Sequence, residues 1–125
     1  MGKIRTYINS NEKKLWTLFD TGARNTYIVA DKANDLLAWE IKSSEPVALG
    51  GKTHYITKEC ILLGNIEEFP IRVKARIIDD IGCDEENKRI EVVFGALAMQ
   101  EWGIRPVPDE EKLDLSNYPR EFVEF

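Results

Sequence analysis

Short extended segments, each ended by turn residues, recur along this sequence and constrain its fold more than any other feature. The clearest is 71–78, where apolar residues alternate with charged ones over most of the segment, as in a strand with one buried face. Similar segments predict further strands at 3–10, 15–19, 26–29, 45–49, 53–58, 60–63, 90–94, 112–115 and 121–125. The run 15–19 is almost entirely apolar, which is typical of a strand buried on both faces. The fold class is therefore mostly β, and the strand spacing is that of a small closed β-barrel.

Two short helices are expected among these strands. The segment 31–37 begins with Asp31, a residue type that can cap a helix, and continues with apolar residues at helical spacing. The segment 96–102 is also predicted to be helical. Gly103 and Pro106 follow it, and both residue types commonly end helices.

A pair of glycines, Gly50 and Gly51, separates the predicted strands 45–49 and 53–58. Both central residues of a tight hairpin turn need a positive φ, so a Gly-Gly pair between two extended segments predicts a β-hairpin. His54, the single histidine of the chain, is then expected to be an exposed residue of that hairpin.

Length and charge limit the kind of protein this is. The chain has 125 residues, the size of one domain, so we expect a single domain over 1–125. Its net charge of −5 argues against a nucleic-acid surface, which needs a basic stripe. The sequence lacks both a stretch of about 18 apolar residues and the apolar run of a signal peptide. We therefore expect a cytoplasmic protein without nucleic-acid or membrane partners.

Cysteine, histidine and acidic residues give little support to a metal site. Cys60 and Cys83 form no Cys-x-x-Cys pair, and two thiols in an unsecreted chain are more often free than bridged, so the sequence leaves their pairing open. A metal site rich in histidine is impossible with His54 alone. The acidic residues within 79–86 lack the spacing of a calcium loop, so we expect a solvated loop there.

Asp20 stands at the end of the apolar run 15–19 and is followed by Thr21 and Gly22. A carboxylate at the end of a buried strand costs free energy unless it is paired, hydrogen-bonded or functional. Gly22 allows a tight turn and the close approach of a ligand, and the hydroxyl of Thr21 can fix the loop by hydrogen bonding. An ordinary turn at the end of a strand is the alternative interpretation of these three residues.

The wider segment 18–28 resembles the active-site strand and loop of the retropepsin-like aspartic proteases. Two apolar residues precede Asp-Thr-Gly-Ala, and two variable residues, a hydroxyl residue and an apolar pair follow it. The segment 93–102 resembles the second signature of that family, in which two apolar residues and a glycine open a short helix. Gly95 follows Asp20 by 75 residues, a separation that fits one lobe. The segment 48–53 is similar to the tip of the family's β-hairpin flap.

The resemblance, which covers roughly residues 3–104, implies an aspartic endopeptidase that cleaves a peptide or protein substrate. Each chain of a homodimer would supply one Asp20, and the two carboxylates would share one proton and activate one water. Thr21 and Gly22 would complete the catalytic turn, and neither a metal nor a cofactor would be needed. The residues implied to bind substrate are Ala23, Arg24, Asn25, Leu49, Gly50, Gly51, Lys52, Phe94 and Gly95.

Two other functions stay open. The chain also fits a peptide-binding or scaffold module with weak catalysis, because the presence of Asp20 does not establish that a dimer forms. A metal-dependent hydrolase would depend on the acidic residues within 79–86 and has little support. Arg24 stands where family members more often have an acidic or small residue, and Ala96 where retroviral members have arginine. These two differences leave the substrate preference and the dimer geometry open.

Overall fold

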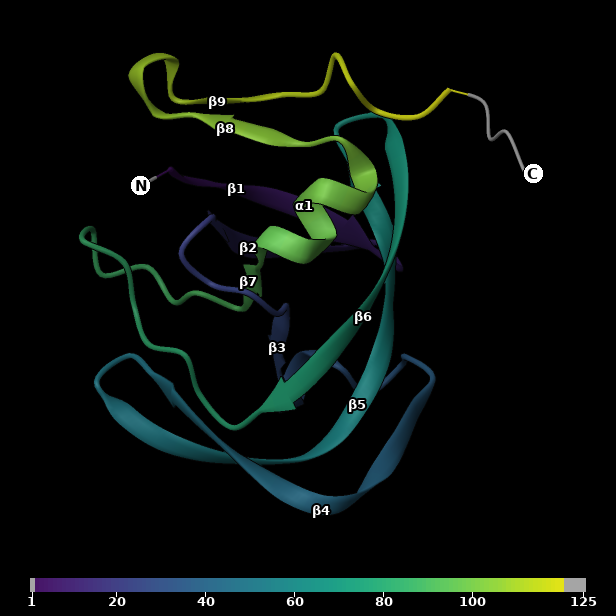
Figure 1. The fold of residues 1–125 in the computed structure, drawn as a ribbon, viewed down its shortest axis with the longest axis vertical. Coiled ribbons are helices and arrows are strands. Elements are labelled where there is room, and N and C mark those ends of the chain that lie inside the picture. The colour runs from purple at the N-terminus through teal and green to yellow at the C-terminus, as the bar shows by residue number, and fades with distance from the viewer. Residues whose placement is uncertain (1, 121–125) are drawn as a thin grey trace.

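The structure is a computed structural model that describes residues 2–120 (Figure 1). The chain is mostly β, as predicted, with one α-helix, α1 (Ala96–Trp102), in the described residues. The strands are β1 (Lys3–Ser10), β2 (Lys13–Asp20), β3 (Tyr27–Val29), β4 (Ala38–Leu49), β5 (Lys52–Ile66), β6 (Phe69–Ile78), β7 (Val92–Phe94), β8 (Arg105–Val107) and β9 (Lys112–Asp114). Short 3-10 turns span Ala30–Lys32 and Pro108–Glu110. The strand predicted at 121–125 lies outside the described residues.

Six strands close into a ring, in the order β1, β2, β7, β3, β6 and β5, and β5 returns to β1 through the pair Asn9 and Asn65. β4 pairs with β5 and extends the sheet beyond the ring. The pairs β2–β7 and β3–β6 are parallel. Parallel neighbours cannot be joined by a tight turn, so these strands come from distant parts of the chain. This topology brings the end of β2 beside the end of β7.

Two apolar clusters form the core, one on each face of β2. Leu15, Thr17 and Phe19 are fully buried toward one side, whereas Trp16 and Leu18 are half-buried and pack against the second cluster. The prediction of a strand buried on both faces is therefore wrong for 15–19. The half-buried face is apolar because it borders the second cluster, whose buried members are Tyr27, Val29, Ile56, Ile78, Ile90 and Val93.

β4 and β5 form one long hairpin, which crosses the lower part of Figure 1. The predicted segments 53–58 and 60–63 belong to a single strand, because Glu59 between them pairs with Trp39 and continues the ladder. At the tip, Gly50 has a φ of 62° and Gly51 a φ of 82°. The predicted Gly-Gly turn is therefore confirmed.

The two predicted helices have different outcomes. α1 has the predicted bounds and ends at Gly103, whose φ of 63° is the left-handed conformation of a helix cap. The segment 31–37 is not an α-helix, and only a 3-10 turn forms at Ala30–Lys32. The carboxylate of Asp31 caps no backbone N–H and instead binds the guanidinium of Arg89 with two bonds of 2.7 and 2.9 Å. In residues 2–120, no helix has the length and apolar character needed to cross a membrane.

β8 and β9 form a separate two-stranded sheet at the top of Figure 1. β9 was expected, but β8 was not, because Pro106 at its centre is a residue that interrupts strands. Pro106 is tolerated because this sheet has only two strands, so each strand is an edge. Both cysteines are free: Cys60 is buried and Cys83 is exposed. Burial raises the pKa of the Cys60 thiol to about 11.

Candidate active site

Asp20 is the last residue of β2 and lies between two neighbouring strands. Its backbone pairs with Lys3 of β1, and the residue before it, Phe19, pairs with Phe94 of β7. The side chain is half-buried, and its Oδ1 accepts a hydrogen bond of 2.8 Å from the backbone N–H of Gly22. This local bond fixes the carboxylate over its own turn.

Three hydrogen bonds join the loop after Asp20 to the start of α1. The buried hydroxyl of Thr26 accepts a bond of 3.0 Å from the N–H of Gly95. The N–H groups of the next two residues donate to the carbonyls of Ala23 and Arg24, at 2.7 and 3.2 Å. The two segments that resemble the family signatures are therefore in direct contact.

Glycine is the only residue type that fits at position 95. A Cβ atom there would lie 2.2 Å from the carbonyl oxygen of Asn25 and 2.8 Å from that of Arg24. Side-chain atoms do not approach backbone oxygens so closely, so any other residue would push the loop away from α1. Thr26 was not among the predicted site residues. Its position directly before the buried strand β3 was the signal that its hydroxyl points inward.

Thr21 connects the Asp-Thr-Gly turn to the beginning of β1. Its hydroxyl accepts a bond of 2.9 Å from the N–H of Gly2, and its own N–H donates to the carbonyl of Gly2 at 3.0 Å. The side chain is otherwise exposed. In this chain Thr21 therefore holds the turn, as its hydroxyl was expected to do.

The loop between β6 and β7 is anchored by Asp84. Its Oδ1 accepts bonds of 2.9 Å from the N–H groups of Glu86 and Lys88, and its Oδ2 accepts one of 2.8 Å from the indole of Trp16. The Arg5 guanidinium lies 3.3 Å from the same carboxylate. These contacts, first of all the bond from the Lys88 N–H, lower the pKa of Asp84. The expectation of a simply solvated loop is wrong at this residue, whose side chain is 4% exposed.

A cavity of about 300 Å³ lies between this loop and the half-buried face of β2. Leu18 contributes to its wall and stands two residues before Asp20, so the two side chains share one face of the strand. The complete lining is Lys3, Arg5, Leu18, Cys83, Asp84, Glu85 and Ile90. None of these residues was predicted to bind substrate, although the alternation along β2 could have identified Leu18.

The tip of the β4–β5 hairpin lies against the same loop. A Cβ atom on Gly50 would lie 2.8 Å from the carbonyl oxygen of Ile81. Val47 and Leu49 of the hairpin pack on the second apolar cluster, as does Ala23 of the loop after Asp20. The hairpin tip, the loop between β6 and β7 and the turn after β2 all lie on the left side of Figure 1. The fold therefore brings the hairpin and the loop after Asp20 to one apolar cluster.

His54 is not the exposed residue that the sequence predicted, because its side chain is 2% exposed. Its ring lies beside the hairpin tip, where Nδ1 lies 2.6 Å from Oδ1 of Asp79 and Nε2 lies 3.0 Å from the carbonyl oxygen of Leu49. The sequence held a signal for this position, because His54 shares a strand face with the fully buried Ile56.

The remaining predicted substrate residues differ in accessibility. Arg24 and Lys52 are exposed, and Asn25 is half-buried. Phe94 is fully buried, and its ring packs on Phe19 with centroids 4.9 Å apart, which places its side chain in the core.

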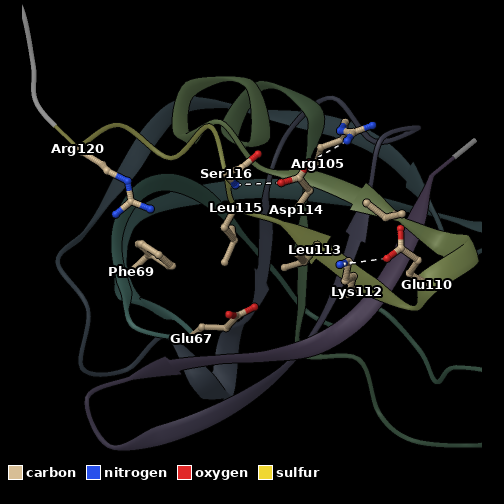
Figure 2. Close-up of a pocket in the computed structure, with 11 residues that line it drawn as sticks. Glu67, Phe69, Arg105, Glu110, Lys112, Leu113, Asp114, Leu115, Ser116 and Arg120 are labelled. Atoms are coloured by element: carbon tan, nitrogen blue, oxygen red, sulfur yellow. Dashed lines mark hydrogen bonds and ion pairs between the residues drawn. The ribbon is translucent and has the colours of Figure 1, made fainter.

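A second cavity, of about 430 Å³, lies below the β8–β9 sheet (Figure 2). Its charged side chains are largely paired with one another, as Arg105 is with Asp114 and Lys112 with Glu110. Arg120 lies over the ring of Phe69 at 5.5 Å. No residue of the Asp-Thr-Gly turn or of the hairpin tip lines this cavity. It is therefore separate from the candidate active site.

Comparison with known proteins gives matches only at the level of structure. The sequence matches no protein-family model, and no curated protein is significantly similar to it. The chain is similar to the retroviral protease-like domain of Ddi1 from Leishmania major, with a TM-score of 0.67 and 14% identity. That match covers 94% of this chain and 90% of the other.

Two viral structures are also similar. The EIAV protease, solved with an inhibitor, matches with a TM-score of 0.60 and 14% identity, over 84% of this chain and 92% of the other. A foamy viral protease–reverse transcriptase, solved with double-stranded DNA, matches with a TM-score of 0.51 and 12% identity. That match covers 83% of this chain and 16% of the other. The chain therefore has the retropepsin-like fold of a single lobe.

Proposed function

We propose that this chain, which has the retropepsin-like fold, is an aspartic endopeptidase that works as a homodimer. The observation that carries the proposal is a set of hydrogen bonds that hold Asp20 and its loop, which we call the interlock. The carboxylate is fixed by the N–H of Gly22, and its loop is locked to Gly95 through the hydroxyl of Thr26. An ordinary strand-ending turn has no need of this second, long-range contact, which holds the carboxylate at a defined place on a rigid frame.

One chain carries half of the proposed site. The Asp-Thr-Gly sequence occurs once, and the structure describes one lobe. In residues 2–120, no hydrogen bond joins the Asp20 carboxylate to another carboxylate. A two-carboxylate mechanism therefore requires a second copy, and two-fold symmetry is the commonest way to pair identical chains.

The chemistry follows from two Asp20 side chains facing each other. Two like charges at close range cannot both ionise easily, so the pair holds one proton and titrates as a unit. The ionised carboxylate removes a proton from the shared water, which attacks the scissile carbonyl. The other carboxyl donates its proton to the carbonyl oxygen. Loss of the shared proton at higher pH removes this acid and ends the reaction.

The substrate is an extended peptide held between the hairpin and the catalytic loop. The hairpin tip would cover the peptide, and its backbone groups would bind the peptide as an added strand. The cavity beside Leu18 would take a substrate side chain next to the scissile bond. Its wall combines apolar Leu18 and Ile90 with the paired charges of Arg5 and Asp84.

Cleavage of a denatured protein, with and without pepstatin or EDTA, tests this proposal. We expect cleavage that pepstatin inhibits, that EDTA does not affect and that Asp20→Asn abolishes while the fold is retained. Sensitivity to EDTA would instead indicate a metal-dependent hydrolase. Binding of the peptide without cleavage by the wild-type chain would indicate a scaffold or peptide-binding module.

A further inference from the structure

The buried ring of His54 makes two polar contacts that take no part in the proposed reaction. His54 is the only histidine of the chain, and its buried ring lies on β5 beside the hairpin tip. Both ring nitrogens have a partner: Asp79 at 2.6 Å and the carbonyl of Leu49 at 3.0 Å. The ring therefore bridges the hairpin tip and the residue that follows β6.

The two partners determine which form of the ring satisfies both contacts. A backbone carbonyl only accepts hydrogen bonds, and so does an ionised carboxylate. A neutral imidazole has one N–H and can serve only one of the two partners. The imidazolium ion has two N–H groups and serves both. The Asp79 side chain is 74% exposed, and the bond from His54 lowers its pKa, so it is ionised except in strong acid.

The groups around His54 leave Asp79 as its main charged neighbour. β4 places the apolar residue Val47 opposite His54. The charged residue of β4 nearest to Val47 in sequence is Glu45, which is bound to Arg76 at 2.6 Å. The loop after β6 adds Asp80, another acid, beside Asp79. On its own strand the nearest charged residues are Lys52 and Lys58. The charged residues nearest to His54 in the chain and across the hairpin are therefore two acids on the loop and two lysines on β5.

The bridge holds the hairpin tip where it meets the loop between β6 and β7. The carbonyl that His54 binds belongs to Leu49, the last residue of β4. The next residue, Gly50, is packed so closely on the carbonyl of Ile81 that a Cβ atom would lie 2.8 Å from it. Without the bond from His54, the hairpin tip would be held only by the contact of Gly50 with the carbonyl of Ile81 and by the packing of Leu49.

We infer that His54 is a positioning residue whose protonation fastens the hairpin tip to Asp79, so that the flap is held down in mild acid and released near neutral pH. This inference rests on the proposed function for its role in catalysis, because the hairpin acts as a flap only in a peptidase. The sign follows from linkage: the fastened state binds one more proton than the released state, so falling pH favours it. Protonation of Asp79 in strong acid removes the bridge again.

Two variants separate protonation from simple packing. In Asp79→Asn the carboxamide donates to Nδ1, so a neutral His54 ring serves both partners and the bridge no longer needs a proton. We expect the hairpin of Asp79→Asn to stay fastened up to about pH 8. In His54→Gln no group titrates there, and we expect the pH dependence of the hairpin to disappear.

The test uses the full chain without a histidine tag and needs no catalysis. Amide hydrogen exchange at residues 49–54 is measured at about pH 6 and about pH 8, corrected for intrinsic exchange, with β1 as the internal control. We expect protection of the wild-type hairpin to fall about tenfold between the two pH values, as for the loss of one charge-assisted hydrogen bond. Equal protection at both pH values, or the same fall in Asp79→Asn, would overturn the inference.

A second measurement covers the case in which a variant does not fold. The single imidazole gives unambiguous ring signals in a nitrogen–proton NMR spectrum of the wild-type chain. At about pH 6 we expect both ring nitrogens to carry a proton. One neutral tautomer at that pH would refute the inference. Because neither measurement depends on cleavage, both stand apart from the pepstatin assay, whose failure would remove the proposed peptidase alone.

Discussion

Replacement of Thr26 by valine tests the interlock that holds the Asp20 loop. The hydroxyl of Thr26 is the acceptor for the N–H of Gly95, at 3.0 Å, and the residue is 3% exposed. Valine keeps the shape of threonine and removes the oxygen. The N–H of Gly95 is then left buried without a partner, which costs about 1–3 kcal/mol.

Urea unfolding measures this loss. With a denaturant slope of about 1.5 kcal/mol per M, we expect the midpoint to fall by about 0.7–2 M. All samples need one fixed protein concentration, because the stability of a homodimer varies with concentration.

Thr17→Val provides a matched control for this experiment. Thr17 is also fully buried, but its hydroxyl donates to the carbonyl of Leu15 in its own strand, at 2.9 Å. Removing that donor leaves no N–H without a partner, so we expect a loss below about 1 kcal/mol. If Thr26→Val unfolded at the same urea concentration as the wild type or as Thr17→Val, the interlock would not be what holds the loop.

Two further substitutions test the loop and the hairpin. Asp84→Asn should lower the urea midpoint at neutral pH. Because hydrogen bonds, first of all the one from the Lys88 N–H, lower the pKa of Asp84, its stabilisation is lost as pH falls through that pKa. The difference between variant and wild type should therefore shrink in acid, and a difference that grew would contradict this assignment. Replacing Gly50 and Gly51 by valine should reduce turnover about tenfold or more with a smaller effect on stability, because both have positive φ and Gly50 has no space for a Cβ atom beside Ile81. Unchanged kinetics in that double variant would show that this hairpin is not the flap.

The elements predictable from the sequence are those specified by local chemistry. The alternation over 71–78 marks β6, the Gly50–Gly51 pair marks a turn whose residues have positive φ, and Gly103 marks the end of α1. Each of these signals lies within a few residues of the structure that it specifies. The Asp20 turn was identifiable for the same reason, because its apolar strand and its glycine are contiguous.

Features that depend on distant contacts could not be predicted in this way. Asp31 has the residue type of a helix cap, but Arg89 binds its carboxylate, and the chain turns toward β4 without forming a helix. Asp84 stands among acidic residues that indicate a solvated loop, yet Trp16 and Arg5 reach it from β2 and β1. Sequence alone does not show which of several acids a distant donor will select.

His54 is a different case, because a local signal existed and was outweighed. Its position next to a glycine turn suggested exposure, whereas its alternation with Ile56 placed it on the buried face. Burial of an imidazole requires partners, and Asp79, the partner that explains it, comes 25 residues later in the chain. The sequence pattern could not identify Asp79 as that partner.

Mixing active and inactive chains tests most directly whether two chains each supply one Asp20 to a shared site. Wild-type chain is held at a constant concentration above the dimer dissociation constant, and increasing amounts of Asp20→Asn chain are added and allowed to exchange. If both carboxylates are needed, random pairing should reduce the cleavage rate to about one half at equal amounts and to about one tenth at a ninefold excess. A cleavage rate that stays constant or rises while mixed dimers form would show that one Asp20 is sufficient and would contradict the shared site.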